Sequence, residues 1–353
     1  IGIWGLGTFL PKTVRTNDWW SPSIVEEWRT RQARRFTNLT DMTDLGPGAK
    51  LVLEATAKLA DDPFEGARER RVVDEGMRST DMGIHAAREA MERAGIKPTD
   101  VDFVLVQSMV PDYHNTPDGC RIHLELGIRP SCFTATVDAS CSGFLTSLTV
   151  AQGLITAGIG KVGLLVQCAP MSRILRAEDP WSAAFGDAAT AVVVGQVREG
   201  RGILAQAHQT DGRFHGGLVT GVPNGRWHDK GAAYMYVESN ERARGMVMAI
   251  PDAVKNMVES SLVEAKIEKK DVAFLAAHQA TLWFGELIQN YVGLPNAKRV
   301  NTFPWTTSLS GCNLPMVMAI AVREGMLKED DVTVMFSGAT GMTAGALVCR
   351  WGR

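Results

Sequence analysis

The first residue that could do chemistry is Cys141, which lies in the stretch "VDASCSGFLTSLTVAQG" at 137–153. The cysteine follows a hydrophobic strand, stands among small residues and opens a predicted helix. A helix N-terminus favours a thiolate, so Cys141 could be a nucleophile. Free cysteine is also common in crowded cores, so it could equally be a packing residue. This segment alone leaves both interpretations open.

Three further features could complete a site. His278 closes a predicted strand in "AAHQAT", a polar turn "TTSLSGCN" spans 306–313, and a glycine-rich turn "FSGATGMTAG" spans 336–345. A thiol and an imidazole are the minimum set for covalent acyl transfer. Backbone N–H groups at the helix start and the glycine turn could stabilise an oxyanion. Each signal is weak by itself, because a histidine at a strand end is often only a structural hydrogen bonder.

The elements that must position these residues alternate between helices and strands, which indicates an α/β fold. Apolar periodicity predicts helices over 79–95 and 253–267. It predicts strands over 101–110, 161–169, 189–195, 271–280, 331–339 and 345–351.

The order of these elements repeats. "TDVDFVLVQS" at 99–108 matches "KDVAFLAAHQ" at 270–279, and Cys141 matches Cys312 at the same offset. We therefore expect two β-α-β-α-β halves, at 1–200 and 201–353, with five-stranded sheets and a site between them. Residues 30–63 fall outside the repeat and predict a helical insertion, which either shapes a binding mouth or dimer contact or only decorates the surface.

Composition excludes several classes of protein. The 353 residues are 45% hydrophobic, and 37 basic against 39 acidic side chains give a net charge of −2, so we expect no nucleic-acid partner. The six cysteines form no CxxC pair, which argues against zinc and against a disulfide framework. No apolar run approaches the roughly 18 residues that span a bilayer. We expect a cytoplasmic protein with no metal and no membrane partner.

With these residues in view, the chain resembles the thiolase superfamily and, within it, the β-ketoacyl-acyl-carrier-protein synthase III type. The resemblance covers nearly the whole length. It runs through "GTFLPKTVRTN" (7–17), "GARERR" (66–71), "VPDYHNTPDGCRIHLELGI" (110–128), "DASCSGF" (138–144), "FGDAATAVVVG" (185–195), "HQA" (278–280) and "GMTAGALVCRW" (341–351).

The resemblance implies a homodimer of the stacked αβαβα fold. It implies Cys141 as the acyl-accepting nucleophile, His278 as a second catalytic residue, and an oxyanion hole made by the N–H groups of Cys141 and Thr340. The acyl donor would be an acyl-carrier-protein phosphopantetheine thioester or a coenzyme A thioester, with no further cofactor.

The chain departs from the family pattern at its third catalytic residue, an asparagine. Counting back from Pro315 without gaps places that position on Ser308, while Asn313 could serve only if the backbone is shifted. An asparagine amide donates a hydrogen bond well, whereas a serine hydroxyl is shorter.

Other family positions change as well. The residues that sandwich the coenzyme A adenine fall near Ala60 and Phe64, and a carrier-docking arginine is replaced by Trp283. A bulky residue that enters the acyl pocket of the neighbouring subunit falls near Asn115. We therefore expect a specialised relative whose substrate pocket involves Asn115, Phe64 and Trp283.

Three functions remain open at this point. The first is Claisen-type carbon–carbon condensation in polyketide- or fatty-acid-type biosynthesis. The second is acyl transfer to a hydroxyl or amine, which the missing asparagine favours because His278 alone could act as a general base. The third is a non-catalytic partner subunit, which the presence of both Cys141 and His278 argues against.

Overall fold

Two β-sheets form the frame of the molecule. The computed structural model describes residues 1–40 and 45–353, with the side chains of 33–40 left out. The first sheet has the order β1 (Gly2–Phe9), β7 (Ala188–Gly195), β6 (Val162–Ala169), β4 (Phe103–Ser108), β5 (Phe133–Thr136). The second has the order β11 (Val272–Ala277), β12 (Val332–Ala339), β13 (Thr343–Arg350), β8 (Gly202–Thr210).

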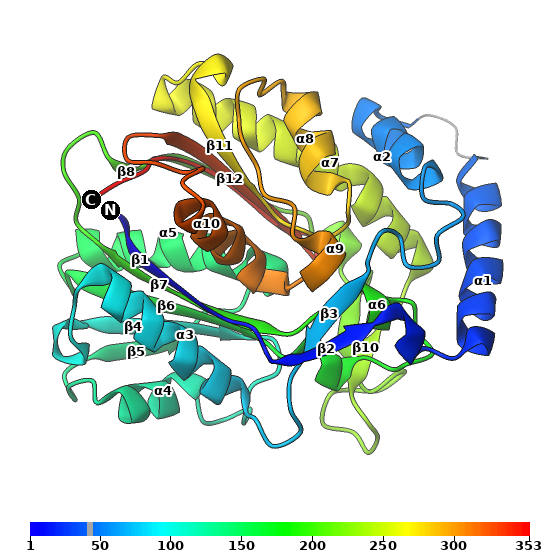
Figure 1. Ribbon diagram of the computed structural model, residues 1–353, viewed down its shortest axis with the longest axis horizontal. Helices are drawn as coiled ribbons and strands as arrows, with labels where there is room; N and C mark the ends of the chain where they lie inside the picture. Colours follow the sequence, from blue (N-terminus) through cyan, green and yellow to red (C-terminus); the bar gives the residue numbers. More distant parts are fainter. Residues whose placement is uncertain (41–44) are drawn as a thin grey trace.

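The helices form three layers around these sheets (Figure 1). Helices α5 (Gly143–Thr156) and α10 (Asn313–Arg323) lie between the sheets and contact both. Helices α3 (Ser79–Ala94) and α4 (Asp118–Leu126) cover the outer face of the first sheet. Helices α7 (Asn240–Ala265) and α8 (Phe284–Val292) cover the outer face of the second. The predicted αβαβα fold is confirmed.

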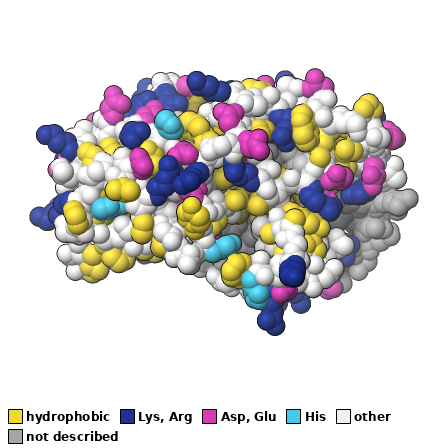
Figure 2. Space-filling view, turned by 90° about the horizontal axis from the view of Figure 1, so that it is seen from below, with side chains coloured by type: hydrophobic (Ala, Val, Ile, Leu, Met, Phe, Trp, Pro, Cys, Tyr) yellow, Lys and Arg dark blue, Asp and Glu magenta, His cyan; other side chains and the backbone are white. Residues whose placement is uncertain are grey.

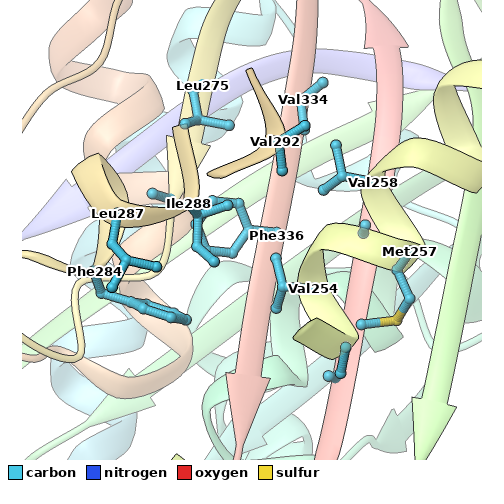
Figure 3. Packing of buried hydrophobic residues seen from close by; sticks show 14 of the residues in the cluster. Val254, Met257, Val258, Leu275, Phe284, Leu287, Ile288, Val292, Val334 and Phe336 are labelled. Carbon is cyan, nitrogen blue, oxygen red and sulfur yellow. The ribbon is translucent and has the colours of Figure 1, made fainter. Parts of the chain in front are cut away.

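The central strands are apolar along their whole length because both faces are covered. Every residue of β7 and of β12 is buried. Figure 3 shows one of the resulting clusters, in which Val254, Met257 and Val258 of α7 and Phe284, Leu287 and Ile288 of α8 pack around Val334 and Phe336 of β12.

The two halves repeat one pattern with one difference. In each sheet two parallel strands are followed by antiparallel ones, β4 and β6 in the first and β11 and β12 in the second. The prediction of five strands is wrong for the second sheet, which has four among the described residues. The counterpart of β5 is reduced to a single bridge between Phe274 and Lys298. The division near residue 200 into two domains stays a prediction.

The helical insertion predicted at 30–63 begins earlier. It consists of α1 (Pro22–Thr40) and α2 (Pro47–Ala57), while 41–44 lie outside the described residues. Helix α2 packs on α7, and the Gly48 N–H donates to Asp252 Oδ1 at 3.1 Å. On α1, Trp28 is buried against Trp20 and Phe64. The insertion is thus packed into the body of the molecule.

Several smaller elements were not expected. These are the strand pairs β2 (Thr13–Thr16) with β3 (Glu69–Val72) and β9 (Val219–Gly221) with β10 (Tyr234–Tyr236), and the short helices α6 (Trp181–Ala184) and α9 (Phe303–Thr306). Within the described part of the chain, no helix is long and apolar enough to cross a membrane, and no group of three His, Cys, Asp or Glu side chains could hold a metal.

Candidate active site

Cys141 lies in a tight turn that joins the first sheet to α5. Residues Ser140–Ser142 form a single 3-10 turn, and Ser140 adopts a left-handed φ of 49°. The Gln107 amide donates to the Ser140 carbonyl at 2.7 Å. From the second sheet, the Ser337 hydroxyl donates to the Cys141 carbonyl at 2.9 Å. Both halves of the molecule therefore fix the position of Cys141.

Two serine hydroxyls contact the Cys141 sulfur. Ser310 Oγ lies 3.6 Å and Ser140 Oγ 3.9 Å from Sγ. Burial raises the pKa of the Cys141 thiol above that of a free thiol, while hydrogen bonds from Ser310 and Ser140 lower it. Because burial has the larger effect, Cys141 rests as a thiol.

The second half contains a matching turn. Residues Ser310–Cys312 form the 3-10 turn before α10, and Ser310 has a φ of 52°. The Gln107 side chain lies against both Gly143 and Gly311, where a Cβ would collide with it. The side-chain amide of Gln107 therefore lies between the two turns and contacts both. Only glycine at positions 143 and 311 leaves room for this amide.

His278 follows the last residue of β11 and faces the same place. Its N–H donates to the Phe336 carbonyl at 3.1 Å, which extends the pairing of β11 with β12. The side chain is 2% exposed, and burial lowers the pKa of His278 to about 4. The imidazole is therefore neutral near pH 7.

Asn313 sets which ring nitrogen of His278 carries the proton. The Leu309 N–H donates to Asn313 Oδ1 at 3.2 Å, so Oδ1 is the oxygen and the amide nitrogen points elsewhere. That nitrogen, Nδ2, lies 3.0 Å from His278 Nδ1. An NH₂ group only donates, so Nδ1 must accept. In a neutral ring the proton is then on Nε2, which has no hydrogen-bond partner among the residues described.

Ser308 occupies a different place. Its N–H donates to the Ala184 carbonyl at 2.9 Å, and its carbonyl accepts from the Gly186 N–H at 3.0 Å. Across the described residues its hydroxyl makes no hydrogen bond to His278. The structure therefore brings Asn313, and not Ser308, to His278.

The loop around Thr340 also reaches the nucleophile turn. Thr340 Oγ1 donates to Ser140 Oγ at 3.4 Å. For the part of the chain that is described, no acceptor is assigned to the backbone N–H of Cys141 or of Thr340. Backbone N–H groups of this kind would suit an oxyanion, and the hole itself stays a prediction.

The three expected pocket residues are dispersed. Asn115 is exposed in the loop before α4, next to His114, whose ring lies 4.5 Å from Trp227. Phe64 packs against Trp20 and Trp28, and Trp283 packs against Phe284. The indole Nε1 of Trp283 is buried and has no hydrogen-bond partner among the described residues. A role for these side chains in the pocket stays a prediction.

A large cavity of about 670 Å³ lies where the insertion meets the second half. Its walls come from α1, from the segment between α2 and β3, from α6 and from the start of α7. They include Trp28, Trp181, Val247 and Met248 as apolar surface and Arg31 and Arg244 as cations. Helix α6 begins at this cavity with Trp181 and ends at Ala184, whose carbonyl accepts from the Ser308 N–H at 2.9 Å.

The sequence matches the family described as 3-oxoacyl-[acyl-carrier-protein (ACP)] synthase III over residues 136–212, and its C-terminal part over 262–351. The chain is 29% identical over 357 residues to a β-ketoacyl-[acyl-carrier-protein] synthase III of Oceanobacillus iheyensis, covering 100% of this chain and 99% of that protein. It is 30% identical over 292 residues to the β-ketoacyl-[acyl-carrier-protein] synthase III of Geobacillus kaustophilus, covering 82% of this chain and 88% of that protein.

This chain belongs to the β-ketoacyl-[acyl-carrier-protein] synthase III family.

The solved structures agree in fold. The 3-oxoacyl-(acyl carrier protein) synthase III of Pseudomonas aeruginosa superposes with a TM-score of 0.79 at 24% identity, covering 100% of this chain and 98% of that one. The resemblance to the synthase III type within the thiolase superfamily is thereby confirmed.

In this synthase III family member, sequence reasoning did not single out Gln107, Leu309 or Ser310 as site residues. Gln107 had one available signal, since the repeat of 99–108 at 270–279 aligns it with His278. Its contacts with two glycines far apart in the chain appear only in the fold. Ser310 had one available signal, since it stands in the second half where Ser140 stands in the first.

Proposed function

We propose that this synthase III family member joins carbon to carbon by Claisen-type condensation, in fatty-acid- or polyketide-type biosynthesis. Cys141 takes an acyl group from a thioester, and a carbanion formed from a second thioester then attacks that acyl group. The chemistry uses side chains and backbone groups of the protein and the thioesters themselves, with no further cofactor. Family membership supports the reaction class.

The hydrogen bond from Asn313 to His278 carries the proposal. It leaves Nε2 of His278 as an N–H donor, and burial keeps the ring neutral. A donor of this kind stabilises the carbonyl oxygen of a thioester as it becomes an enolate, most strongly in a site shielded from water. Asn313 and His278 together thus supply the hydrogen-bond support for the enolate. In the family pattern an asparagine at the position of Ser308 would have contributed to it.

The same tautomer argues against transfer to a hydroxyl or amine. That reaction needs a general base to remove the acceptor's proton, and an imidazole whose Nε2 already holds a proton cannot receive another there. Protonation of Nδ1 first is opposed by the Asn313 amide. Retention of Cys141 and His278 in one site also argues against a non-catalytic subunit.

The cavity between α1, α6 and α7 supports an elongated donor, so we propose that the thioester arm of an acyl carrier protein or coenzyme A enters there. About 670 Å³ suits a small-molecule arm. The lining is mainly apolar, with Trp28 and Trp181 from different elements facing the same space. The insertion, through α1, is then a wall of the substrate entrance.

A homodimer is supported by an exposed sheet edge. β5 is the end strand of the first sheet, and Phe133 on it is 45% exposed. On the neighbouring α4, Leu124 is 74% exposed. An unpaired edge beside exposed apolar side chains can add a strand from a second copy, which would make one continuous sheet. All six cysteines are free, which fits a reducing location such as the cytoplasm.

Product analysis tests the function. The purified protein is loaded with an acyl thioester, the mass gain at Cys141 is verified, and the acyl-enzyme is then offered a malonyl thioester or, separately, alcohols and amines. We expect release of CO₂ and a 3-oxoacyl thioester from the first and no transfer to the second. An ester or amide product without any 3-oxoacyl product would overturn the proposal.

A further inference from the structure

Ser310, on the second-half turn, touches the reacting sulfur. We propose that Ser310 is a further catalytic residue, whose hydroxyl donates a hydrogen bond to the Cys141 sulfur while the sulfur carries negative charge during acylation. The inference deepens the proposed function and rests on Cys141 being the acyl-accepting nucleophile.

The contacts of Ser310 carry this step. Ser310 is fully buried, and its Oγ lies 3.6 Å from Cys141 Sγ. Buried hydroxyls are almost always hydrogen-bonded, and the sulfur is the partner that the structure gives this one. A hydrogen bond to a charged acceptor is stronger than one to a neutral acceptor, so the Ser310 contact gains strength as the thiolate forms.

The backbone gives a second reason. Ser310 adopts a φ of 52°, a conformation that glycine adopts without cost and other residues avoid. Strain of this kind persists where the surrounding structure has a use for it. Ser140, its counterpart in the first half, has a φ of 49° and also points its hydroxyl at Sγ, from 3.9 Å. Two strained serines, one from each half, therefore converge on one sulfur.

His278 does not fill this role. Within the described residues the hydrogen bonds to the Cys141 sulfur come from Ser310 and Ser140 and not from the imidazole. His278 Nδ1 is occupied by Asn313, and Nε2 keeps its own proton. The side-chain donors that the structure places on the sulfur, among the residues described, are therefore hydroxyls.

The acylation step balances as follows. The sulfur of Cys141 forms a bond to the acyl carbon, and the bond between that carbon and the sulfur of the carrier breaks. The electron pair of the broken bond leaves with the carrier sulfur, and the proton lost from Cys141 ends on that departing thiol. Ser310 keeps its proton throughout and only donates a hydrogen bond.

The test compares Ser310→Ala with the wild type. Alkylation of Cys141 by iodoacetamide is followed by intact mass across neutral and alkaline pH, and acyl loading is timed separately. We expect the apparent pKa of Cys141 to rise and both rates near neutral pH to fall about tenfold. Condensation from a preloaded acyl-enzyme should slow by no more than acylation does, because the sulfur is uncharged in the acyl-enzyme and regains negative charge only when the Cys141 thiolate leaves the acyl carbon.

Two further variants serve as controls. Ser310→Gly also removes the hydroxyl while suiting the left-handed backbone, so it should behave like Ser310→Ala even if the alanine protein folds poorly. Ser261→Ala removes a buried hydroxyl on α7 and should leave both rates unchanged.

An unchanged alkylation profile in both Ser310 variants would overturn the assignment. A wild type that takes no acyl group would instead overturn the proposed function, while the alkylation profile would still decide the role of Ser310.

Discussion

The two matching turns of this protein share a backbone conformation but present different side chains to the site. Ser140–Ser142 and Ser310–Cys312 are both 3-10 turns that begin with a left-handed serine and lead into a central helix. Gln107 lies against Gly143, just after the first turn, and against Gly311 in the second. The first turn presents the Cys141 sulfur. The second has Gly311 at that place, and the residues on either side of it present the Ser310 hydroxyl and the Asn313 amide.

This difference shows how a duplicated fold produces an asymmetric site. In the proposed reaction the first half supplies the sulfur that bonds to the acyl group, and the second half supplies Ser310, His278 and Asn313 around it. Asn313, in the first turn of α10, reaches His278 because α10 lies between the sheets and beside β11. The orientation of one amide therefore decides whether His278 donates or accepts.

Removing the sulfur from the first turn should have the largest effect on activity. Cys141→Ala should lose acylation by at least about 10³-fold, because no other side chain there can form the covalent intermediate. Intact mass after exposure to acyl thioesters measures this. Cys120→Ala removes an exposed cysteine and should still load fully; loading of the Cys141→Ala protein would contradict the assignment.

The second turn is tested by changing its amide. Asn313→Ala should reduce condensation by about 10²-fold, because His278 loses the hydrogen bond that fixes its tautomer. Asn313→Asp should reduce it further, because a carboxylate accepts from Nδ1 and leaves Nε2 without a proton. Steady-state rates with a malonyl thioester measure both.

Ser308→Ala is the matched control for these variants. Its rate should stay within about threefold of the wild type, because Ser308 bonds to Ala184 and Gly186 through its backbone and not through its hydroxyl. A large loss from Ser308→Ala with none from Asn313→Ala would reverse the roles.

The pH dependence of stability sharpens the comparison further. The pKa of His278 is lowered from 6.5 to about 4 in the folded protein. Between these two pH values, the imidazole is protonated in the unfolded chain and neutral in the folded one. The contribution of His278 to the free energy of unfolding should therefore be fully present above pH 6.5. It should fall by about 3 kcal/mol as the pH drops toward 4. Denaturant unfolding of wild type and His278→Gln measures it, and equal acid sensitivity of the two would contradict the burial of a neutral ring.

The smallest expected effect is on packing. Gly311→Ala places a methyl group against the Gln107 side chain and should destabilise the protein by about 2 kcal/mol. Thermal unfolding measures the loss. Combining it with Gln107→Ala should restore part of the stability, and strictly additive losses would mean that Gln107 does not hold the two turns.

The sequence predicted the elements that carry strong periodicity. Helix α3 and strands β6, β7 and β12 appear within a residue or two of their expected bounds. Helix α7 was expected to begin at 253, after Pro251, yet it begins at Asn240 with the proline inside. The fifth strand of the second sheet was expected from the repeat, and its segment makes only one bridge.

The candidate site was predictable where one residue sufficed. Cys141 opens a predicted helix of the first half and His278 closes a predicted strand of the second, so the pattern of elements indicates both residues. The third partner was not predictable, because counting from Pro315 follows the backbone and reaches Ser308. Only the folded turn shows that Leu309 orients the Asn313 amide toward His278.

The central claim is that the second-half turn makes His278 a hydrogen-bond donor at Nε2, and ¹⁵N NMR of the imidazole tests it most directly. The protein is labelled at histidine, and the His278 signals are assigned by their loss in His278→Gln. The account predicts a neutral ring near pH 7, with the proton on Nε2 and none on Nδ1. A proton on Nδ1, or a charged imidazolium near neutral pH, would contradict it and return His278 to the role of a general base.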